Sequence, residues 1–143
     1  MTDLPSEAEQ KIHASWSASQ FEDSATATLE TYGDEILSFL VSRLRSPSDG
    51  QEVFAMFAED LWVGLPKFSW RCSMRTWAYT LARNAASRYA SAPQRNLARN
   101  LTLSAPGRVS VIVERVRSAT HIYQKTEVKD RFRAMREKLD ADD

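Results

Sequence analysis

Cysteine, glycine and long apolar runs are scarce in this chain, and each scarcity excludes a kind of site or segment. Cys72 is the only cysteine among 143 residues, so no internal disulfide can form, and one cysteine with two distant histidines makes a poor zinc site. The four glycines do not form a phosphate-binding loop. No apolar run reaches the roughly 18 residues of a membrane-spanning helix, and the first residues lack the basic start and apolar middle of a signal peptide. We therefore expect a cytoplasmic protein of one domain, without a metal, a cofactor or a membrane segment.

The chain carries no formal net charge, but its charges are strongly segregated. Residues 1–60 contain twelve acidic residues against three basic ones. Such asymmetry indicates that different segments meet different partners, and a purely basic segment favours a polyanion. From residue 61 to residue 113 there is no acidic residue, whereas eight basic residues occur: Lys67, Arg71, Arg75, Arg83, Arg88, Arg95, Arg99 and Arg108.

Apolar residues recur every three to four positions in several segments, which predicts an all-α fold built around a bundle of three main helices. The first helix is expected over about 21–44. The second should begin at Asp49, because Asp49 and Glu52 resemble a capping box, and Gly64 should mark its end. Ser73 is the expected N-cap of a third helix that reaches about Ser91. The unit formed by residues 21–91 is the predicted domain.

The segments that flank this domain are less regular. Residues 1–20 show no sustained apolar period, and we expect a flexible, loosely docked arm. Residues 92–124 are predicted to be a polar linker that includes a helix over about 108–123. Alternating valines in that helix would also suit a strand, but no partner strand is present elsewhere. A last helix is expected over about 126–139.

The stretch FSWRCSMRTWAYTLARN, from Phe68 to Asn84, interleaves aromatic and basic residues without any acid. Arginine and lysine neutralise phosphates, and aromatic rings stack on unpaired bases with about 1–3 kcal/mol per base. The free amides of the helix N-terminus near Ser73 would add an anion site. Trp77 lies on the apolar face and is expected to pack in the core, whereas Phe68 and Trp70 in the loop either meet bases or cap the bundle end. The outward arginines are equally compatible with an ordinary solvated face.

The order of these motifs resembles region 2 of bacterial RNA polymerase sigma factors of the extracytoplasmic-function type. DGQEVFAMFAEDLWVGLPKF is similar to the acidic, apolar helix of that family, which ends in a Trp and a Leu-Pro-x-Phe turn. SMRTWAYTLARNAASRY is similar to the helix that follows, with its Thr-Trp start and Ala-Arg-Asn. Many relatives carry Gln-Glu near the middle of the first of these helices, where this chain has Ala55 and Met56. The resemblance covers about residues 28–89.

The resemblance implies an all-α promoter-melting domain that binds core RNA polymerase through the clamp helices of its largest subunit. It also implies that the loop and third helix hold the non-template single strand of the minus-ten promoter element, with one base flipped out. The implied polymerase-facing residues are Asp49, Glu52, Met56, Glu59, Asp60 and Val63. The implied DNA-facing residues are Lys67, Phe68, Trp70, Arg71, Arg75, Arg83, Asn84 and Arg88.

Two other classes of function are alternatives to this one. An interaction module that binds polymerase or an anti-sigma factor without opening DNA would use the acidic half of the chain and the outward Met56 and Val63. An enzyme is not expected, because we find neither paired carboxylates nor a nucleophile with a base. Residues 125–143 resemble the truncated start of region 4, so we expect no binding to the minus-thirty-five element.

Overall fold

The computed structural model describes residues 6–91 and 105–118, and within these residues every regular element is a helix. The predicted all-α fold is therefore confirmed. Of the helices in the described ranges, none is both long and apolar enough to cross a membrane. The elements are α1 (Glu7–Ser17), α2 (Phe21–Leu44), α3 (Pro47–Gly64), the short 3-10 helix η1 (Leu65–Lys67), α4 (Met74–Ser91) and a helix over residues 107–118.

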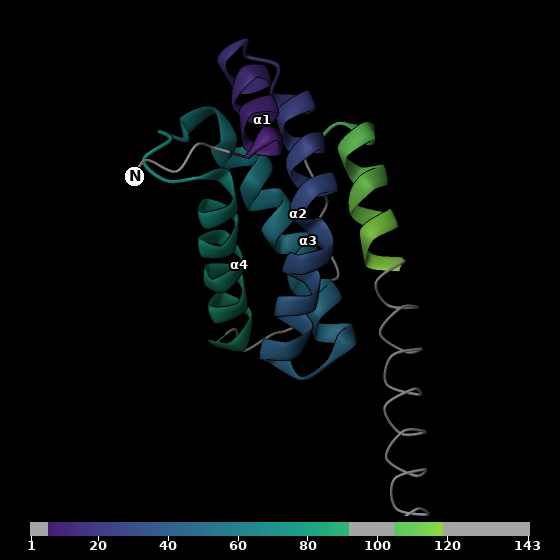
Figure 1. Ribbon diagram of the computed structural model, residues 1–143. Helices are drawn as coiled ribbons and strands as arrows, with labels where there is room; N and C mark the ends of the chain where they lie inside the picture. Colours follow the sequence, from purple (N-terminus) through teal and green to yellow (C-terminus); the bar gives the residue numbers. More distant parts are fainter. Residues whose placement is uncertain (1–5, 92–104, 119–143) are drawn as a thin grey trace, which may run out of the picture.

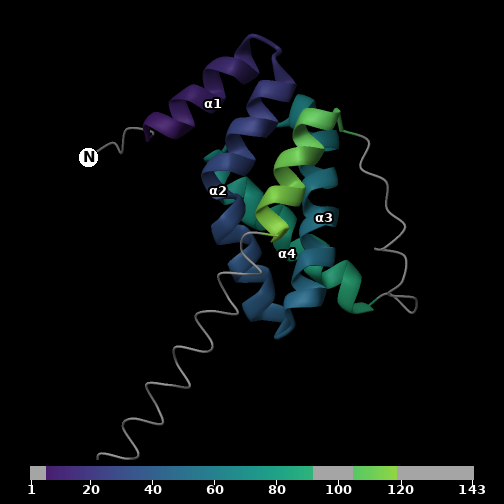
Figure 2. The same ribbon diagram turned by 90° about the vertical axis from the view of Figure 1, so that its right-hand side faces the viewer.

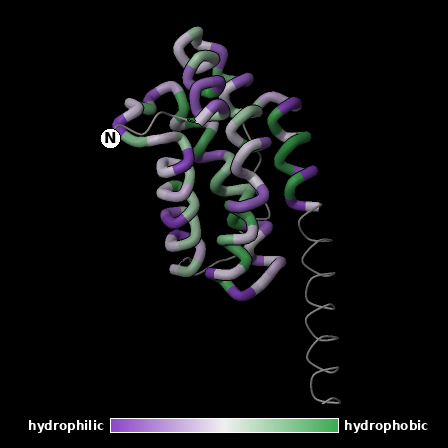
Figure 3. Tube along the Cα trace, viewed as in Figure 1, coloured by the Kyte–Doolittle hydropathy of each residue, from purple (hydrophilic) through white to green (hydrophobic). Residues whose placement is uncertain are grey.

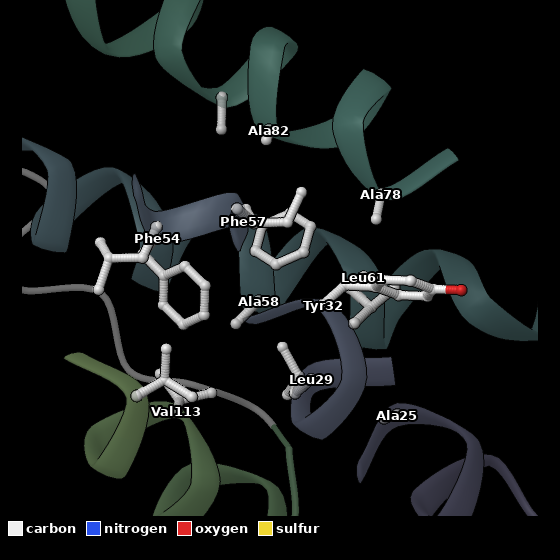
Figure 4. Close-up of a cluster of buried hydrophobic side chains, with 14 of the residues drawn as sticks. Ala25, Leu29, Tyr32, Phe54, Phe57, Ala58, Leu61, Ala78, Ala82 and Val113 are labelled. Atoms are coloured by element: carbon white, nitrogen blue, oxygen red, sulfur yellow. The ribbon is translucent and has the colours of Figure 1, made fainter. Parts of the chain in front are cut away.

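The pair formed by α2 and α3 is the centre of the molecule. α4 and helix 107–118 lie on opposite sides of this pair, and α1 crosses one end of it (Figures 1 and 2). In the close-up of Figure 4, Phe54 and Phe57 of α3 lie between the alanines of α4 and Val113 of helix 107–118. Ala78 and Ala82 are fully buried, so α4 approaches the rings closely with small side chains. The bounds predicted for α2 and α4 are confirmed.

The prediction of a loosely docked arm is wrong for the described part of residues 1–20. α1 is a regular helix whose N-cap Ser6 accepts a hydrogen bond from the backbone amide of Glu9 at 3.1 Å. Its Ile12 is fully buried, and the indole Nε1 of Trp16 donates to the carbonyl of Leu65 at 2.8 Å. The apolar pattern was too short to predict this docking, because the face that α1 buries also contains a carboxylate, that of Glu9.

The start of α3 also differs from the prediction. The N-cap is Ser46, whose extended backbone (φ −155°) lets its hydroxyl accept from the amide of Asp49 at 3.1 Å, with Pro47 as the first helical residue. α2 ends just before it, where Arg45 adopts a left-handed φ of 55°. The predicted box of Asp49 and Glu52 is therefore not the cap. The predicted end at Gly64 is confirmed.

Helix 107–118 confirms part of the helix expected in the linker and belongs to the bundle. Strongly hydrophobic residues recur along it, coloured green in Figure 3, and its inner valines and isoleucine are buried. A Cβ placed on Gly33 of α2 would lie 3.1 Å from Val116, so the two helices pack closely there. Arg108 forms an ion pair with Asp23 of α2 at 2.6 Å. The expected helix over 126–139 and most of the linker lie outside the described residues.

Candidate nucleic-acid interface

The loop between η1 and α4 buries one of its two predicted base-stacking rings. Phe68 is only 7% exposed, and its ring stacks on Trp77 with centroids 4.5 Å apart and planes at 21°. Trp77 in turn covers Gly64, where an added Cβ would come within 3.1 Å of the indole. Packing of Trp77 inside the fold is thus confirmed, whereas Phe68 is not placed to meet a base and caps the end of the bundle, the alternative considered for it.

Trp70 is the second loop aromatic, and α1 covers it. Its ring centroid lies 4.5 Å from that of His13, 5.9 Å from that of Trp16 and 4.8 Å from that of Phe68. Its backbone has a left-handed φ of 58°, which is uncommon for a residue with a bulky side chain. Within the described residues, its indole Nε1 is buried and has no hydrogen-bond partner. The ring that was expected to receive a base is therefore half-buried under α1.

The N-terminus of α4 binds a carboxylate of the chain itself. Ser73 caps the helix as predicted, and its hydroxyl accepts from the amide of Thr76 at 3.1 Å. The amides of Met74 and Arg75 donate to the Glu9 carboxylate of α1 at 2.7 and 3.1 Å. Helix amides that carry partial positive charge favour such an anion. The anion site predicted near Ser73 is thus occupied by Glu9.

Glu9 also accepts a hydrogen bond from the phenol of Tyr32 on α2. Burial and this hydrogen bond raise the pKa of Tyr32 to about 12, because both disfavour the charged phenolate. Sequence reasoning missed Glu9 as a site residue. The available signal was its spacing from Ile12 and Trp16, which places it on the one buried stripe of α1.

A groove of about 720 Å³ opens beside this carboxylate, between α1 and the loop. Its lining includes Glu9, His13, Tyr32, Trp70, Cys72 and Arg75. Cys72 is exposed. Within residues 6–91 and 105–118, no group of three or more His, Cys, Asp or Glu side chains could hold a metal ion.

The predicted DNA-facing residues with polar side chains divide into two groups. Arg75 donates to Glu35 at 2.8 Å and lies over the ring of Tyr79, and Arg88 donates to Asp60 at 2.7 Å. The second group consists of exposed side chains that form no ion pair or side-chain hydrogen bond with the described residues: Lys67, Arg71, Arg83 and Asn84. These four can therefore meet an anion without first breaking a contact with the described part of the chain.

The exposed face of α4 carries no carboxylate. Thr76, Thr80, Arg83 and Ser87 are exposed and spaced by four, three and four residues, which puts them on one stripe. The helix as a whole contains neither Asp nor Glu. This stripe of hydroxyl groups and one guanidinium is a surface that a phosphate backbone can approach without repulsion.

The predicted polymerase-facing residues also divide. Glu52, Met56, Glu59 and Val63 follow one another along α3 at spacings of four, three and four residues, so they share one stripe. Val63 is 58% exposed and is, with Val111, one of the two large hydrophobic residues that are exposed among the described residues. Asp60 instead pairs with Arg88, and Asp49 accepts from the phenol of Tyr89 at 2.7 Å. Both of these aspartates connect α3 to α4.

Comparison of the chain with family models, with curated proteins and with solved structures found no match. The resemblance to sigma region 2 therefore depends on the residues and motifs of this chain alone.

Proposed function

We propose that this protein is a sigma-type transcription initiation module, which binds core RNA polymerase and recognises and melts the minus-ten promoter element. The observation that carries the proposal is the carboxylate-free exposed stripe of α4. Beside it, in and next to the loop before α4, lie Lys67 and Arg71, which form no ion pair with residues 6–91 or 105–118. Single-stranded DNA offers phosphates to such a surface, and the motif order described above supports promoter DNA as its source.

In this proposal the non-template strand runs along α4 and the preceding loop. Lys67, Arg71 and Arg83 neutralise phosphates, and Asn84 donates a hydrogen bond to a phosphate or a base edge. Arg75 and Arg88 contribute less, because each must exchange an ion pair with a carboxylate of the protein for one with phosphate.

The α3 stripe formed by Glu52, Met56, Glu59 and Val63 is the proposed polymerase-binding surface. Two carboxylates beside an exposed valine and a half-buried methionine fit a partner helix pair that is basic with an apolar centre. The clamp helices of the largest polymerase subunit are the proposed partner.

The test of DNA binding uses fluorescence anisotropy with a labelled minus-ten oligonucleotide, as single strand and as duplex. We expect tighter binding to the single strand and a loss of affinity with salt, since phosphate neutralisation releases counterions. Arg71→Gln and Arg83→Gln should each reduce the slope of log K against log salt by about 0.7, the single-strand value per phosphate contact. Arg43→Gln is the matched control, because Arg43 is an exposed arginine near the far end of α2. Equal slopes for all three variants would refute the assignment of α4 and its loop.

A second function is favoured by the burial of Phe68 and the covering of Trp70. With both rings engaged, the chain would bind polymerase or an anti-sigma factor through the α3 stripe without opening DNA. Capture of core polymerase together with no oligonucleotide binding would support this interaction module. In either case Val63→Arg should abolish capture, whereas Val111→Arg, at a 68% exposed valine on helix 107–118, should not.

A further inference from the structure

We propose that α1 is a built-in cover of the Trp70 loop, and that α1 must leave the α4 N-terminus before single-stranded DNA can bind there. This inference rests on the proposed function, since it concerns regulation of the same surface. The arrangement in which α1 covers the loop is then the state of the protein without DNA.

Three sets of contacts hold the cover in place. The Glu9 carboxylate binds two amides of α4 and the phenol of Tyr32. The Trp16 indole donates to the carbonyl of Leu65, just before the loop. The rings of His13 and Trp16 pack against Trp70. Except for Tyr32 on α2, the partners of α1 in these contacts lie in or beside the loop and α4, the elements that would receive DNA.

Trp70 is under local strain in this arrangement. A left-handed φ for a bulky residue and a buried indole N–H without a partner are each unfavourable, and strained residues are found where a segment switches between two arrangements. Both costs can be relieved when the loop is uncovered, because the N–H then reaches water and the backbone is free to relax. The contacts of α1 therefore hold the loop in a conformation that is locally less favourable for Trp70 than the uncovered one.

α1 buries a smaller share of its residues than the two central helices do. Only Glu9 and Ile12 of its eleven residues are buried, whereas ten of the 24 residues of α2 are. Three residues connect α1 to α2, and the middle one, Ser19, has a left-handed φ of 60°. Such a short connection, which belongs to neither helix, can act as a hinge while the α2–α3 pair stays intact.

Phosphate would compete directly with the cover. The Glu9 carboxylate and a DNA phosphate are both anions, and the amides of Met74 and Arg75 can serve only one of them. A bound strand and a docked α1 thus exclude each other. The apparent association constant is therefore the intrinsic one multiplied by the fraction of molecules that are uncovered.

The experiment compares Glu9→Gln with Glu7→Gln in the full chain, using the single-stranded oligonucleotide and anisotropy. Both substitutions remove one negative charge from the first turn of α1, but Glu7 is exposed and only Glu9 contacts α4. We expect Glu9→Gln to lower the dissociation constant about threefold to tenfold, because charge-assisted hydrogen bonds are lost from the covered state only. Glu7→Gln should leave it within twofold of the unaltered chain.

A second pair of variants separates release from a general gain of affinity. Trp16→Phe keeps a ring against Trp70 but loses the hydrogen bond to the carbonyl of Leu65, so it should also tighten binding. If circular dichroism shows that Glu9→Gln has lost helicity, Trp16→Phe takes its place in the comparison. In either background Trp70→Ala should reduce the gain, because the ring that the release of α1 exposes is then missing. A fluorophore on Cys72, the single and exposed cysteine near Trp70, should change its emission when the strand binds.

The outcomes distinguish this inference from the function on which it rests. If the unaltered chain binds the strand but Glu9→Gln and Trp16→Phe bind no more tightly than Glu7→Gln, the cover is refuted and the proposed function stands. A gain that Trp70→Ala leaves undiminished also refutes it. If no variant binds single-stranded DNA, both the cover and the DNA-melting function are refuted.

Discussion

Gly50 provides the sharpest test of how α3 is seated on α2. It is buried in the first turns of α3, and a Cβ at this position would lie 2.5 Å from Cγ2 of Val41 and 3.0 Å from its Cα and backbone nitrogen. The Val41 methyl group can rotate away, but the backbone of α2 cannot move unless the two central helices separate. We therefore expect Gly50→Ala to destabilise the protein.

The expected size follows from two opposing terms. Alanine favours a helix over glycine by about 1 kcal/mol, which would stabilise the variant if no clash occurred. Overpacking of a close contact typically costs about 1–3 kcal/mol, and contact with backbone atoms puts Gly50 at the upper part of that range. The net effect should be a loss of about 1–2 kcal/mol in the free energy of unfolding.

Urea unfolding followed by far-ultraviolet circular dichroism measures this difference. The midpoint should fall while the dependence on urea stays unchanged, as expected for a change in stability alone. Gly107→Ala is the control, because a Cβ there meets nothing within 4 Å, and its midpoint should stay the same or rise slightly. If Gly50→Ala were as stable as the unaltered chain, the close approach of α2 and α3 described here would be wrong.

Three further predictions concern single contacts of the bundle. Ser46→Ala should lower the free energy of unfolding by about 1 kcal/mol, and with it the urea midpoint, because α3 loses its N-cap. Ser48→Ala, at an exposed site in the same turn, should leave the urea midpoint unchanged. Val113→Ala should cost about 2 kcal/mol, because it opens a cavity beneath helix 107–118, and the same substitution at exposed Val111 should cost under about 0.5 kcal/mol in the same assay. The difference in unfolding free energy between the unaltered chain and Tyr32→Phe should be constant below pH 10 and shrink as the pH rises towards 12. The reason is that the Tyr32 phenol has a raised pKa in the folded state, so the unfolded chain loses this proton first. Urea midpoints across this pH range measure the difference, and a difference that stays constant would contradict the raised pKa.

The two places where sequence reasoning misjudged local structure have a common cause. Ser46 and Asp49 are both good N-caps, and the local rule cannot choose between them. The choice is made by the fold, in which Asp49 accepts a hydrogen bond from Tyr89 of α4 and Ser46 is left to cap α3. Residues 7–17 have a single apolar turn, and the carboxylate of Glu9 completes their buried face only because α4 presents its amides to it.

In the candidate interface, too, some features could be predicted from the sequence and others depend on the fold. The absence of acids from residues 61–113 predicted an anion-binding surface. Its best members are the four exposed side chains of Lys67, Arg71, Arg83 and Asn84, which form no ion pair within the described ranges. Composition could not reveal that Arg88 pairs with Asp60, since these residues are 28 positions apart and meet only when α3 and α4 pack together. It also could not tell which loop ring is buried, because both rings follow the η1 turn and their burial depends on partners that the fold brings from α1 and α4.

The sequence by itself therefore determined the all-α class, the bounds of α2 and α4, the end of α3 and the segregation of charge, because helical periodicity and composition are local properties. Only the tertiary structure decided that α1 docks, that Glu9 occupies the α4 N-terminus and that Trp70 is covered. Each of these depends on groups far apart in the chain, as in the 65 residues that separate Glu9 from the amide of Met74. Contacts of that kind are set by packing and by the need of buried polar groups for partners, which no short window of sequence contains.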